Sequence, residues 1–244
     1  MTSQLRFVLI DADSFDDIPD PAAPGARCQT CGYWERLDGH REPPESAVRA
    51  AHARKRSRLL AGSRLAGSYA MLAHDGETPI GYAQFGPISA YPRAQAIRDR
   101  YPSLPDSPAP WVITCLQVMA GAEQRSATGE ALLQAVCAEL DRRGIVAVEA
   151  YPEAAADGWI PSAGPAAVYA AAGFELAAGD ELYPAFRREL TGEGEGADWS
   201  DLLSHVAPAD DDDDAWPLPL PPRPDDDLLR LPTRPKRPNP FGED

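Results

Sequence analysis

Hydrophobic and polar positions in the first 190 residues alternate between two periods, one typical of strands and one typical of helices. Short apolar runs predict strands, and longer stretches with apolar residues three or four positions apart predict helices. The predicted strands are 5–10, two runs within 68–86 that meet at an Asp75-Gly76 turn, 111–118, 145–151, and a final pair near 174–179 and 185–190. The predicted helices are 44–62, about 127–142, and 164–173. The proline-rich stretch 91–110 reads as a loop.

This order of elements predicts an α/β (α+β) fold with a mixed central sheet of about six or seven strands flanked by helices. Composition changes sharply after residue 190. Residues 195–244 hold 13 acidic and 5 basic residues, 10 of the 26 prolines, and an aspartate run from Asp210 to Asp214. Such a segment cannot bury enough apolar surface to fold. We therefore predict a folded domain over 1–190 and a disordered acidic, proline-rich tail over 191–244, which either solvates the protein or binds a protein partner.

Charge and hydropathy exclude several classes of partner. The net charge of −15 argues against nucleic acid, because phosphate binding needs a surplus of lysine and arginine. No apolar run reaches the roughly 20 residues that span a bilayer, and the first residues lack the pattern of a secretory signal. We expect a cytoplasmic protein with no membrane partner, present as a monomer or a homodimer. Its four cysteines are then expected to be free thiols.

A run of small residues lies between the predicted strand 111–118 and the helix that follows. It reads Gln124, Arg125, Ser126, Ala127, Thr128, Gly129, Glu130. The first turn of a helix presents free backbone N–H groups and the positive end of the helix dipole, and small side chains let an anion approach them. The run is therefore either a cradle for a pyrophosphate or an ordinary helix start capped by Ser126 or Thr128.

Three pieces of sequence together resemble the GNAT family of N-acetyltransferases. Gln124-x-x-Ala127-x-Gly129 is similar to the family motif Gln/Arg-x-x-Gly-x-Gly/Ala, Tyr169-x-x-x-Gly173-Phe174 is similar to the end of a later helix, and residues 79–86 (PIGYAQFG) are similar to a hairpin strand. The resemblance covers roughly residues 5–190. It implies acetyl-CoA as cofactor and direct transfer of an acetyl group to a primary amine of a small molecule or a protein.

The resemblance also implies roles for particular residues. Leu116, Gln117 and Val118 would lie at the thioester carbonyl, residues 124–130 would hold the pyrophosphate, and Tyr169 would give a proton to the leaving thiolate. The alternative for Tyr169 is packing in the core. The sequence departs from the family at Ala127, where glycine is usual. If that position needs a positive φ, alanine is strained there and the affinity for coenzyme A falls.

Glu149 is an acidic residue within an otherwise apolar predicted strand. A partly buried carboxylate at that position would suit removal of a proton from the incoming ammonium. Two alternatives stay open. Glu149 either faces solvent, or the proton leaves through a chain of water molecules with no single base.

Residues 27–35 hold a second unusual feature, the pair Cys28 and Cys31, followed by Tyr33, Trp34 and Glu35. Two cysteines at this spacing are compatible with zinc or with a redox pair, but no further ligands stand at supporting spacings, so packing is favoured and no metal site is predicted. Tyr33, Trp34 and Glu35 are candidates for acceptor binding. An aromatic wall with a carboxylate would suit a cationic amine.

Two functions follow from these observations. The leading one is an acetyl-CoA-dependent N-acetyltransferase. The alternative is a catalytically weak or inactive GNAT-shaped protein that binds or regulates a partner through its acidic tail.

Overall fold

A seven-stranded mixed sheet runs through the domain in the order β1-β2-β3-β4-β5-β7-β6. The protein is described by a computed structural model, which covers residues 5–20, 27–37, 43–61, 67–119, 122–152, 164–179 and 184–192. The strands are β1 Leu5–Leu9, β2 Ala70–Asp75, β3 Thr78–Pro87, β4 Trp111–Val118, β5 Ala147–Ala150, β6 Glu175–Ala178 and β7 Ala185–Glu189. Neighbouring strands of this sheet are antiparallel except β4 and β5, which are parallel.

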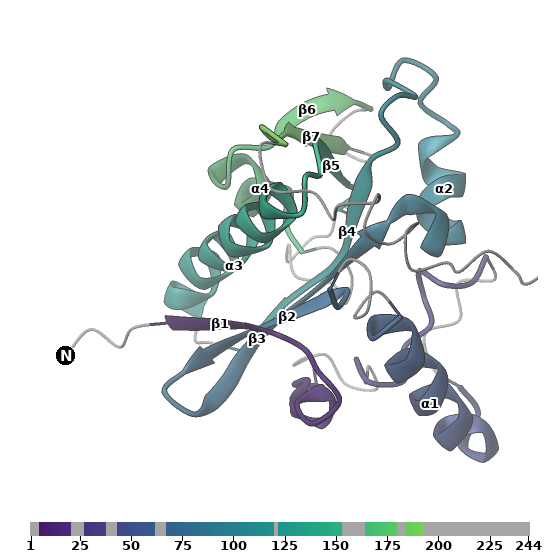
Figure 1. The fold of residues 1–244 in the computed structure, drawn as a ribbon, viewed down its shortest axis with the longest axis vertical. Coiled ribbons are helices and arrows are strands. Elements are labelled where there is room, and N and C mark those ends of the chain that lie inside the picture. The colour runs from purple at the N-terminus through teal and green to yellow at the C-terminus, as the bar shows by residue number, and fades with distance from the viewer. Residues whose placement is uncertain are drawn as a thin grey trace, which may run out of the picture. The chain divides into compact units, whose positions relative to one another are not determined.

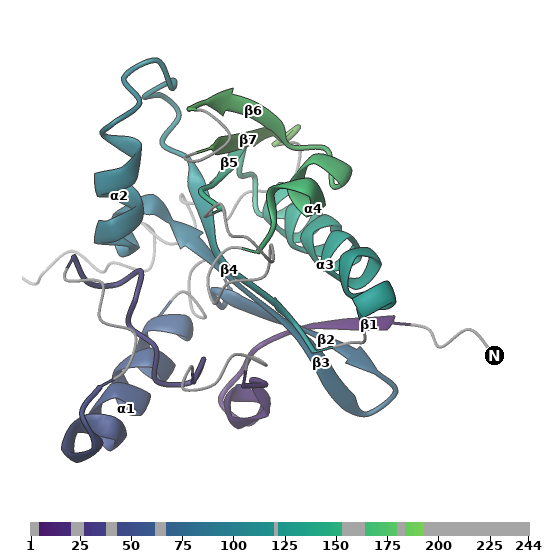
Figure 2. The ribbon, with the colours of Figure 1, turned by 180° about the vertical axis from the view of Figure 1, so that it is seen from behind.

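Helices cover both faces of the sheet. They are α1 Val48–Leu59, α2 Pro92–Arg98, α3 Ala122–Arg142 and α4 Ala166–Ala171, with 3-10 turns at Phe15–Asp17, Glu45–Ala47 and Ile88–Ala90. Helices α3 and α4 lie on one side of the sheet, and α1 and α2 lie on the other (Figure 1, and from behind in Figure 2). No helix within the described residues is long and apolar enough to cross a membrane.

The period-2 alternation of β3 divides its side chains between two hydrophobic clusters. Ala83 and Phe85 belong to a large cluster that includes the buried side of α3, whereas Tyr82 belongs to a smaller cluster with Leu59 of α1. Successive side chains of a strand point to opposite faces, so β3 contributes to the packing on both sides of the sheet. Burial of each large apolar side chain contributes roughly 1.5–3 kcal/mol.

The sequence prediction holds for the strands and fails at two helices. The hairpin between β2 and β3 closes as predicted, with Gly76 at a positive φ of 61°. Helix α2 lies within the stretch that was predicted to be a loop. It has only seven residues and begins at Pro92, a residue that fits the first turn of a helix but that also marks loops. Helix α3 begins at Ala122, five residues before the predicted start.

The predicted tail, residues 191–244, lies outside the described residues except for Thr191 and Gly192. Asp141 of α3 holds both of these residues. The Thr191 hydroxyl donates to Asp141 Oδ1 at 2.9 Å, and the Gly192 N–H donates to the same oxygen at 2.8 Å. The first two residues of the predicted tail are therefore tied to α3.

Candidate active site

The end of β4 has no partner strand on one side. β4 pairs with β5 only through Trp111, Val112 and Ile113, which lie opposite Val148, Glu149 and Ala150. Residues 114–118 continue along β3 alone, so the backbone groups on their other edge have no partner in β5. The residues predicted to lie at the thioester carbonyl, Leu116, Gln117 and Val118, all fall within this segment, which pairs with β3 and not with β5.

A β-bulge lies where the unpaired segment begins. Gln84 of β3 pairs with Cys115, and the next residue, Phe85, pairs with Ile113, so Thr114 is the extra residue on β4. The Thr114 hydroxyl donates to the Gln84 carbonyl at 3.3 Å. A bulge bends its strand and changes the direction of the groups beside it. The backbone N–H and C=O groups of β4 therefore change direction at the point where its pairing with β5 ends.

The start of α4 lies against the unpaired segment. Gly164 has a φ of 76°, and a Cβ on it would lie 3.4 Å from the Leu116 carbonyl oxygen and 3.2 Å from the Leu116 side chain. A left-handed backbone and this close approach both require glycine. Gly164 thus brings α4, and with it Tyr169, to the edge of β4.

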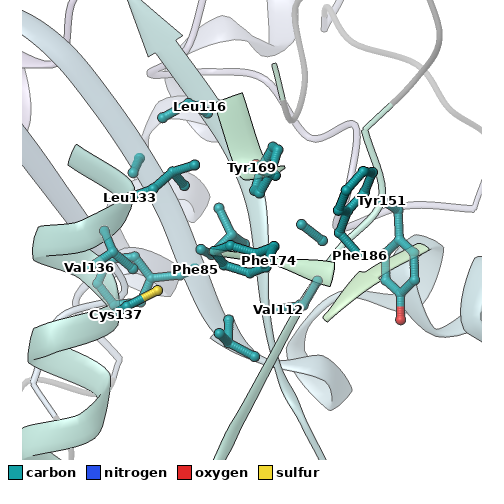
Figure 3. Close-up of a cluster of buried hydrophobic side chains, with 14 of the residues drawn as sticks. Phe85, Val112, Leu116, Leu133, Val136, Cys137, Tyr151, Tyr169, Phe174 and Phe186 are labelled. Carbon is teal, nitrogen blue, oxygen red and sulfur yellow. The ribbon is translucent and has the colours of Figure 1, made fainter. Parts of the chain in front are cut away.

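Tyr169 is completely buried, and its ring packs in the large core cluster. The ring lies edge-on to Phe174 at 5.3 Å and tilted to Phe186 at 6.3 Å. Figure 3 shows it in the same group of side chains as Leu116. Within the part of the chain that the structure describes, its hydroxyl has no hydrogen-bond partner. Burial raises the pKa of Tyr169 well above its usual value, so the hydroxyl keeps its proton. A buried donor without an acceptor is rare, and it indicates that a partner is missing.

The early start of α3 changes which backbone groups are free at its N-terminus. In a helix that begins at Ala122, the N–H groups without an acceptor inside the helix are those of the first turn, residues 122–125. Gln124 and Arg125 belong to that turn. The N–H groups of Ser126, Ala127, Thr128 and Gly129 instead point along the helix toward carbonyls one turn earlier. Thr128 and Gly129 are also buried, and Glu130 accepts a hydrogen bond from Gln134 of the same helix.

The strain expected at Ala127 does not arise. Ala127 lies inside α3, and no residue other than glycine has a positive φ among the described residues. The prediction of a strained alanine assumed that this position belongs to a loop, as glycine in the motif suggests. Here the position is helical, where alanine is the most favourable residue.

Glu149 lies in the sheet on β5, and both of its carboxylate oxygens accept hydrogen bonds from neighbouring side chains. Arg187 Nη1 donates to Oε1 at 2.7 Å, and Arg98 Nε donates to Oε2 at 3.1 Å. The Tyr151 hydroxyl also donates to Oε2. The Glu149 side chain is not exposed at all. Both oxygens are therefore held by cations or a hydroxyl, and these contacts favour a structural ion pair over the role of base that the sequence suggested.

A small cavity lies on the opposite face of the sheet, beneath α1. Its volume is about 140 Å³. It is lined by Thr30, Cys31, Gly32, Glu35, Arg36, Pro43, Ala51, Arg54, Lys55 and Arg58. Of the three residues predicted to bind the acceptor, only Glu35 belongs to this lining. Tyr33 and Trp34 are buried in the core instead, and Arg93 stacks on the Tyr33 ring at 4.0 Å from its centre.

A buried polar network connects the cavity to β3. Lys55 Nζ lies 2.8 Å from Glu35 Oε1 and 2.5 Å from Gln84 Oε1. The Gln84 amide donates to the same Glu35 oxygen at 3.0 Å, and the Tyr82 hydroxyl donates to Gln84 Oε1 at 3.0 Å. The second Glu35 oxygen, Oε2, is buried and has no hydrogen-bond partner among the described residues.

Charge compensation keeps this network ionised. Burial alone would raise the pKa of Glu35, but the Lys55 ammonium and the hydrogen bonds from Lys55 and Gln84 outweigh it and hold the pKa below its usual value. Burial alone would lower the pKa of Lys55, and Glu35 reverses that effect. Glu35 is therefore a carboxylate at neutral pH, suited to hold a cation and poorly suited to store a proton.

The cysteine pair contributes no metal or redox chemistry that the structure supports. Cys28 is buried and Cys31 half-buried, and both are free thiols. Burial raises the pKa of Cys28 to about 12, which opposes both zinc binding and thiol exchange, because each needs the thiolate. Among the described residues there is no group of three or more side chains that could hold a metal ion. Cys28 packs in the smaller hydrophobic cluster.

The sequence did not lead us to Lys55 and Gln84 as residues of the site, although each is a polar residue at an otherwise apolar position. Ala51, Lys55 and Leu59 are the buried residues of α1 and stand four positions apart, so the lysine interrupts the apolar stripe of its helix. Gln84 likewise stands within the buried end of β3. A polar residue at a core position needs a partner, and these two are partners of each other.

Comparisons with known proteins support the fold. No protein-family model matches the sequence, and no curated protein matches it. Solved structures with a similar fold include a mosquito arylalkylamine N-acetyltransferase like 5b, at a TM-score of 0.48 and 13% identity, covering 77% of this chain and 100% of that chain. The PaiA N-acetyltransferase of Thermoplasma acidophilum, in complex with coenzyme A, has a TM-score of 0.45 and 12% identity and covers 76% and 99%.

A third similar structure is yncA, a putative acetyltransferase from Salmonella typhimurium with acetyl-CoA, at a TM-score of 0.44 and 14% identity, covering 80% of this chain and 98% of that chain. At these scores the likeness is one of fold only. The predicted mixed sheet of about seven strands flanked by helices is confirmed by the strands and helices of the structure itself.

Proposed function

We propose that this protein is an acyl-CoA-dependent N-acetyltransferase, which transfers the acetyl group of acetyl-CoA directly to a primary amine. The observation that supports this best is the unpaired segment of β4, residues 114–118. It begins at a bulge, has the start of α4 against it, and leads within a few residues to the N-terminus of α3. One stretch of chain thus combines two features. Backbone groups on the edge of β4 beyond β5 could bind a thioester, and N–H groups in the first turn of α3 could bind a pyrophosphate.

Acetyl-CoA would supply the acetyl group as a thioester. In the proposed reaction, a backbone N–H of Leu116 or Val118, which flank Gln117 and point away from β3, polarises the thioester carbonyl, and the first turn of α3 binds the pyrophosphate. Of the predicted pyrophosphate residues, Gln124 and Arg125 would contribute N–H groups, while Ser126, Ala127 and Gly129 would contribute only their small size.

The amine nitrogen attacks the carbonyl carbon, so that a C–N bond forms and the C–S bond breaks. Tyr169, whose phenol is protonated at neutral pH, gives its hydroxyl proton to the departing sulfur. The carboxylate of Glu35 holds the acceptor as an ammonium ion. One ammonium proton leaves through water before the attack, because the contacts of Glu149 do not favour it as a base. The second nitrogen proton, lost as the amide forms, returns to the Tyr169 phenolate and restores the phenol.

Tyr169→Phe tests this proposal. The substitution removes a hydroxyl that has no partner among the described residues, so it should leave folding and acetyl-CoA binding intact. Loss of the proton donor should lower kcat with a good acceptor about hundredfold. Calorimetric titration of the full chain with acetyl-CoA measures binding, and release of the free thiol measures turnover. Unchanged turnover in the Tyr169→Phe variant would show that Tyr169 is not the acid.

One observation favours the alternative of a GNAT-shaped binding or regulatory protein. Helix α3 runs through the motif residues 126–129, so their N–H groups do not point at a ligand. The same titration decides between the two functions. Binding of acetyl-CoA in the micromolar range supports the enzyme, whereas no binding at millimolar acetyl-CoA supports the alternative.

A further inference from the structure

Positive charge gathers around the cavity beneath α1, although the protein as a whole has a net charge of −15. Helix α1 contains five cationic residues and no acidic one: Arg49, Arg54, Lys55, Arg56 and Arg58. Three of these line the cavity together with Arg36, and Glu35 is the one acidic residue among the described residues of the lining. The described lining therefore has four cations and one carboxylate, a formal net charge of +3.

The charge of Glu35 is already compensated within the cavity wall. Lys55 lies 2.8 Å from it, and both side chains are more than nine-tenths buried. Of the other cations in the lining, Arg54 and Arg58 then set the field inside the cavity. An amine with no other charge would be repelled by this field, whereas an anionic group would be attracted. This reverses the expectation from sequence that the acceptor pocket suits a simple cationic amine.

The cavity is also placed to hold an acceptor next to the transfer site. The network of Glu35 and Lys55 ends on Gln84, which pairs with Cys115 beside the bulge in β4. Glu35 Oε2 is buried and has no hydrogen-bond partner among the described residues, while Arg54 of the same lining is exposed. A buried carboxylate oxygen without a donor indicates a missing donor, and an ammonium group provides one.

We infer that the acceptor is a small amine that also carries an anionic group, a carboxylate or a phosphate, and that Arg54 and Arg58 bind this group. The inference rests on the proposed acetyltransferase function and names its acceptor class. The cavity has a volume of about 140 Å³. It therefore takes the charged end of a small molecule rather than a folded protein surface.

Matched pairs of acceptors test the inference in the full-length protein. Arginine and agmatine, glycine and methylamine, and phosphoethanolamine and ethanolamine each present the same amine with and without an anion. Binding is measured by calorimetry in the presence of coenzyme A, and turnover by release of the thiol from acetyl-CoA. The anionic member of at least one pair should bind about tenfold more tightly than its partner. The first two pairs report on a carboxylate and the third on a phosphate.

Two variants on the same helix locate the effect. Arg54→Gln removes an exposed cation from the cavity lining, and Arg49→Gln removes an exposed cation from the same helix outside the lining. Arg54→Gln should reduce the preference for the anionic member about tenfold, and Arg49→Gln should leave it unchanged. Both residues are exposed, so neither substitution threatens folding.

The outcomes separate this inference from the proposed function. If acetyl-CoA binds, and the members without an anionic group bind and react as well as those with one, the acceptor class is wrong and the proposed acetyltransferase function stands. If anionic amines bind with a preference that depends on Arg54 but no thiol is released, the cavity assignment stands and the proposed function fails. A preference that Arg49→Gln and Arg54→Gln lower equally overturns the assignment to this cavity.

Discussion

Glu149 and Glu35 are both buried carboxylates beside cations, yet their surroundings differ in one respect. Glu149 accepts hydrogen bonds from two arginines and a tyrosine, which together occupy both of its oxygens. Glu35 accepts from Lys55 and Gln84 at Oε1 alone, and Oε2 has no partner among the described residues. Burial and charge are common to both. The unused oxygen beside a cavity is what distinguishes a binding group from a structural one.

The positions of the two residues in the fold explain this difference. Glu149 lies on β5, with Val112 of β4 opposite it on one side and Arg187 of β7 on the other. A strand within a sheet has neighbours on both sides, so its side chains meet fixed partners. Glu35 lies between helices in a segment without regular structure, and one side of it faces the cavity. Irregular segments on a rigid scaffold are where binding groups are commonly found.

The largest effect that we expect is a loss of stability on substitution of Glu149, and its absence would contradict the structural role given to this residue. Glu149→Gln leaves Arg98 and Arg187 without their shared charge partner in a buried setting. Breaking a buried ion pair from one side destabilises by roughly 3–5 kcal/mol. We expect a loss of that size in the free energy of unfolding, measured by urea denaturation. Activity for each folded molecule should remain, because Glu149 takes no part in the proposed reaction.

Glu189→Gln is the matched control for this prediction. Glu189 also pairs with Arg187, at 2.6 Å, but its side chain is 67% exposed. Exposed pairs contribute about 0–1 kcal/mol. A loss at Glu149 no larger than the loss at Glu189 would mean that the buried network is not a structural element.

A smaller effect, on activity, is expected at Glu35. Glu35→Gln keeps a hydrogen-bond acceptor for Lys55 but removes the charge that holds the ammonium group of the acceptor. We expect kcat/KM to fall about hundredfold, which corresponds to about 2.7 kcal/mol of transition-state stabilisation. Thiol release is measured at a temperature where circular dichroism shows the variant to be folded.

Glu149→Gln then serves as the reference for Glu35→Gln, since both substitutions remove a buried carboxylate charge. The comparison predicts that only Glu35→Gln changes the rate for each folded molecule. Equal losses of activity in the two variants would remove the distinction between a binding carboxylate and a structural one.

The sequence predicted the strands well because their signal is local. Apolar runs and an Asp75-Gly76 turn are enough to place β2, β3 and β4, and the order of elements then limits the sheet to few arrangements. The partners of Glu149 could not be predicted in this way. Arg98 and Arg187 are distant in sequence from Glu149 and from each other, and they meet only because α2 and β7 pack around β5.

Local patterns also misplaced part of the candidate site. The prediction grouped Tyr33, Trp34 and Glu35 as one acceptor wall because they are consecutive, but the two aromatic residues pack in the core while Glu35 lines the cavity. The prediction at α3 failed for a related reason. Small residues at 126–129 were interpreted as the start of the helix, yet serine, alanine and threonine are all compatible with a helix interior, and the helix begins at Ala122.

The smallest expected effect concerns Ala127, where the sequence suggested a defect in the cofactor site. Because Ala127 lies inside α3, Ala127→Gly should lower the free energy of unfolding by about 0.5–1 kcal/mol, the usual difference between glycine and alanine within a helix. It should not tighten acetyl-CoA binding, since the free N–H groups belong to the first turn and not to residue 127. Calorimetric titration and urea denaturation of the same preparation give both quantities. Tighter binding in the glycine variant would mean that the motif forms a loop around the pyrophosphate when acetyl-CoA is bound, and that the start of α3 unwinds to admit it.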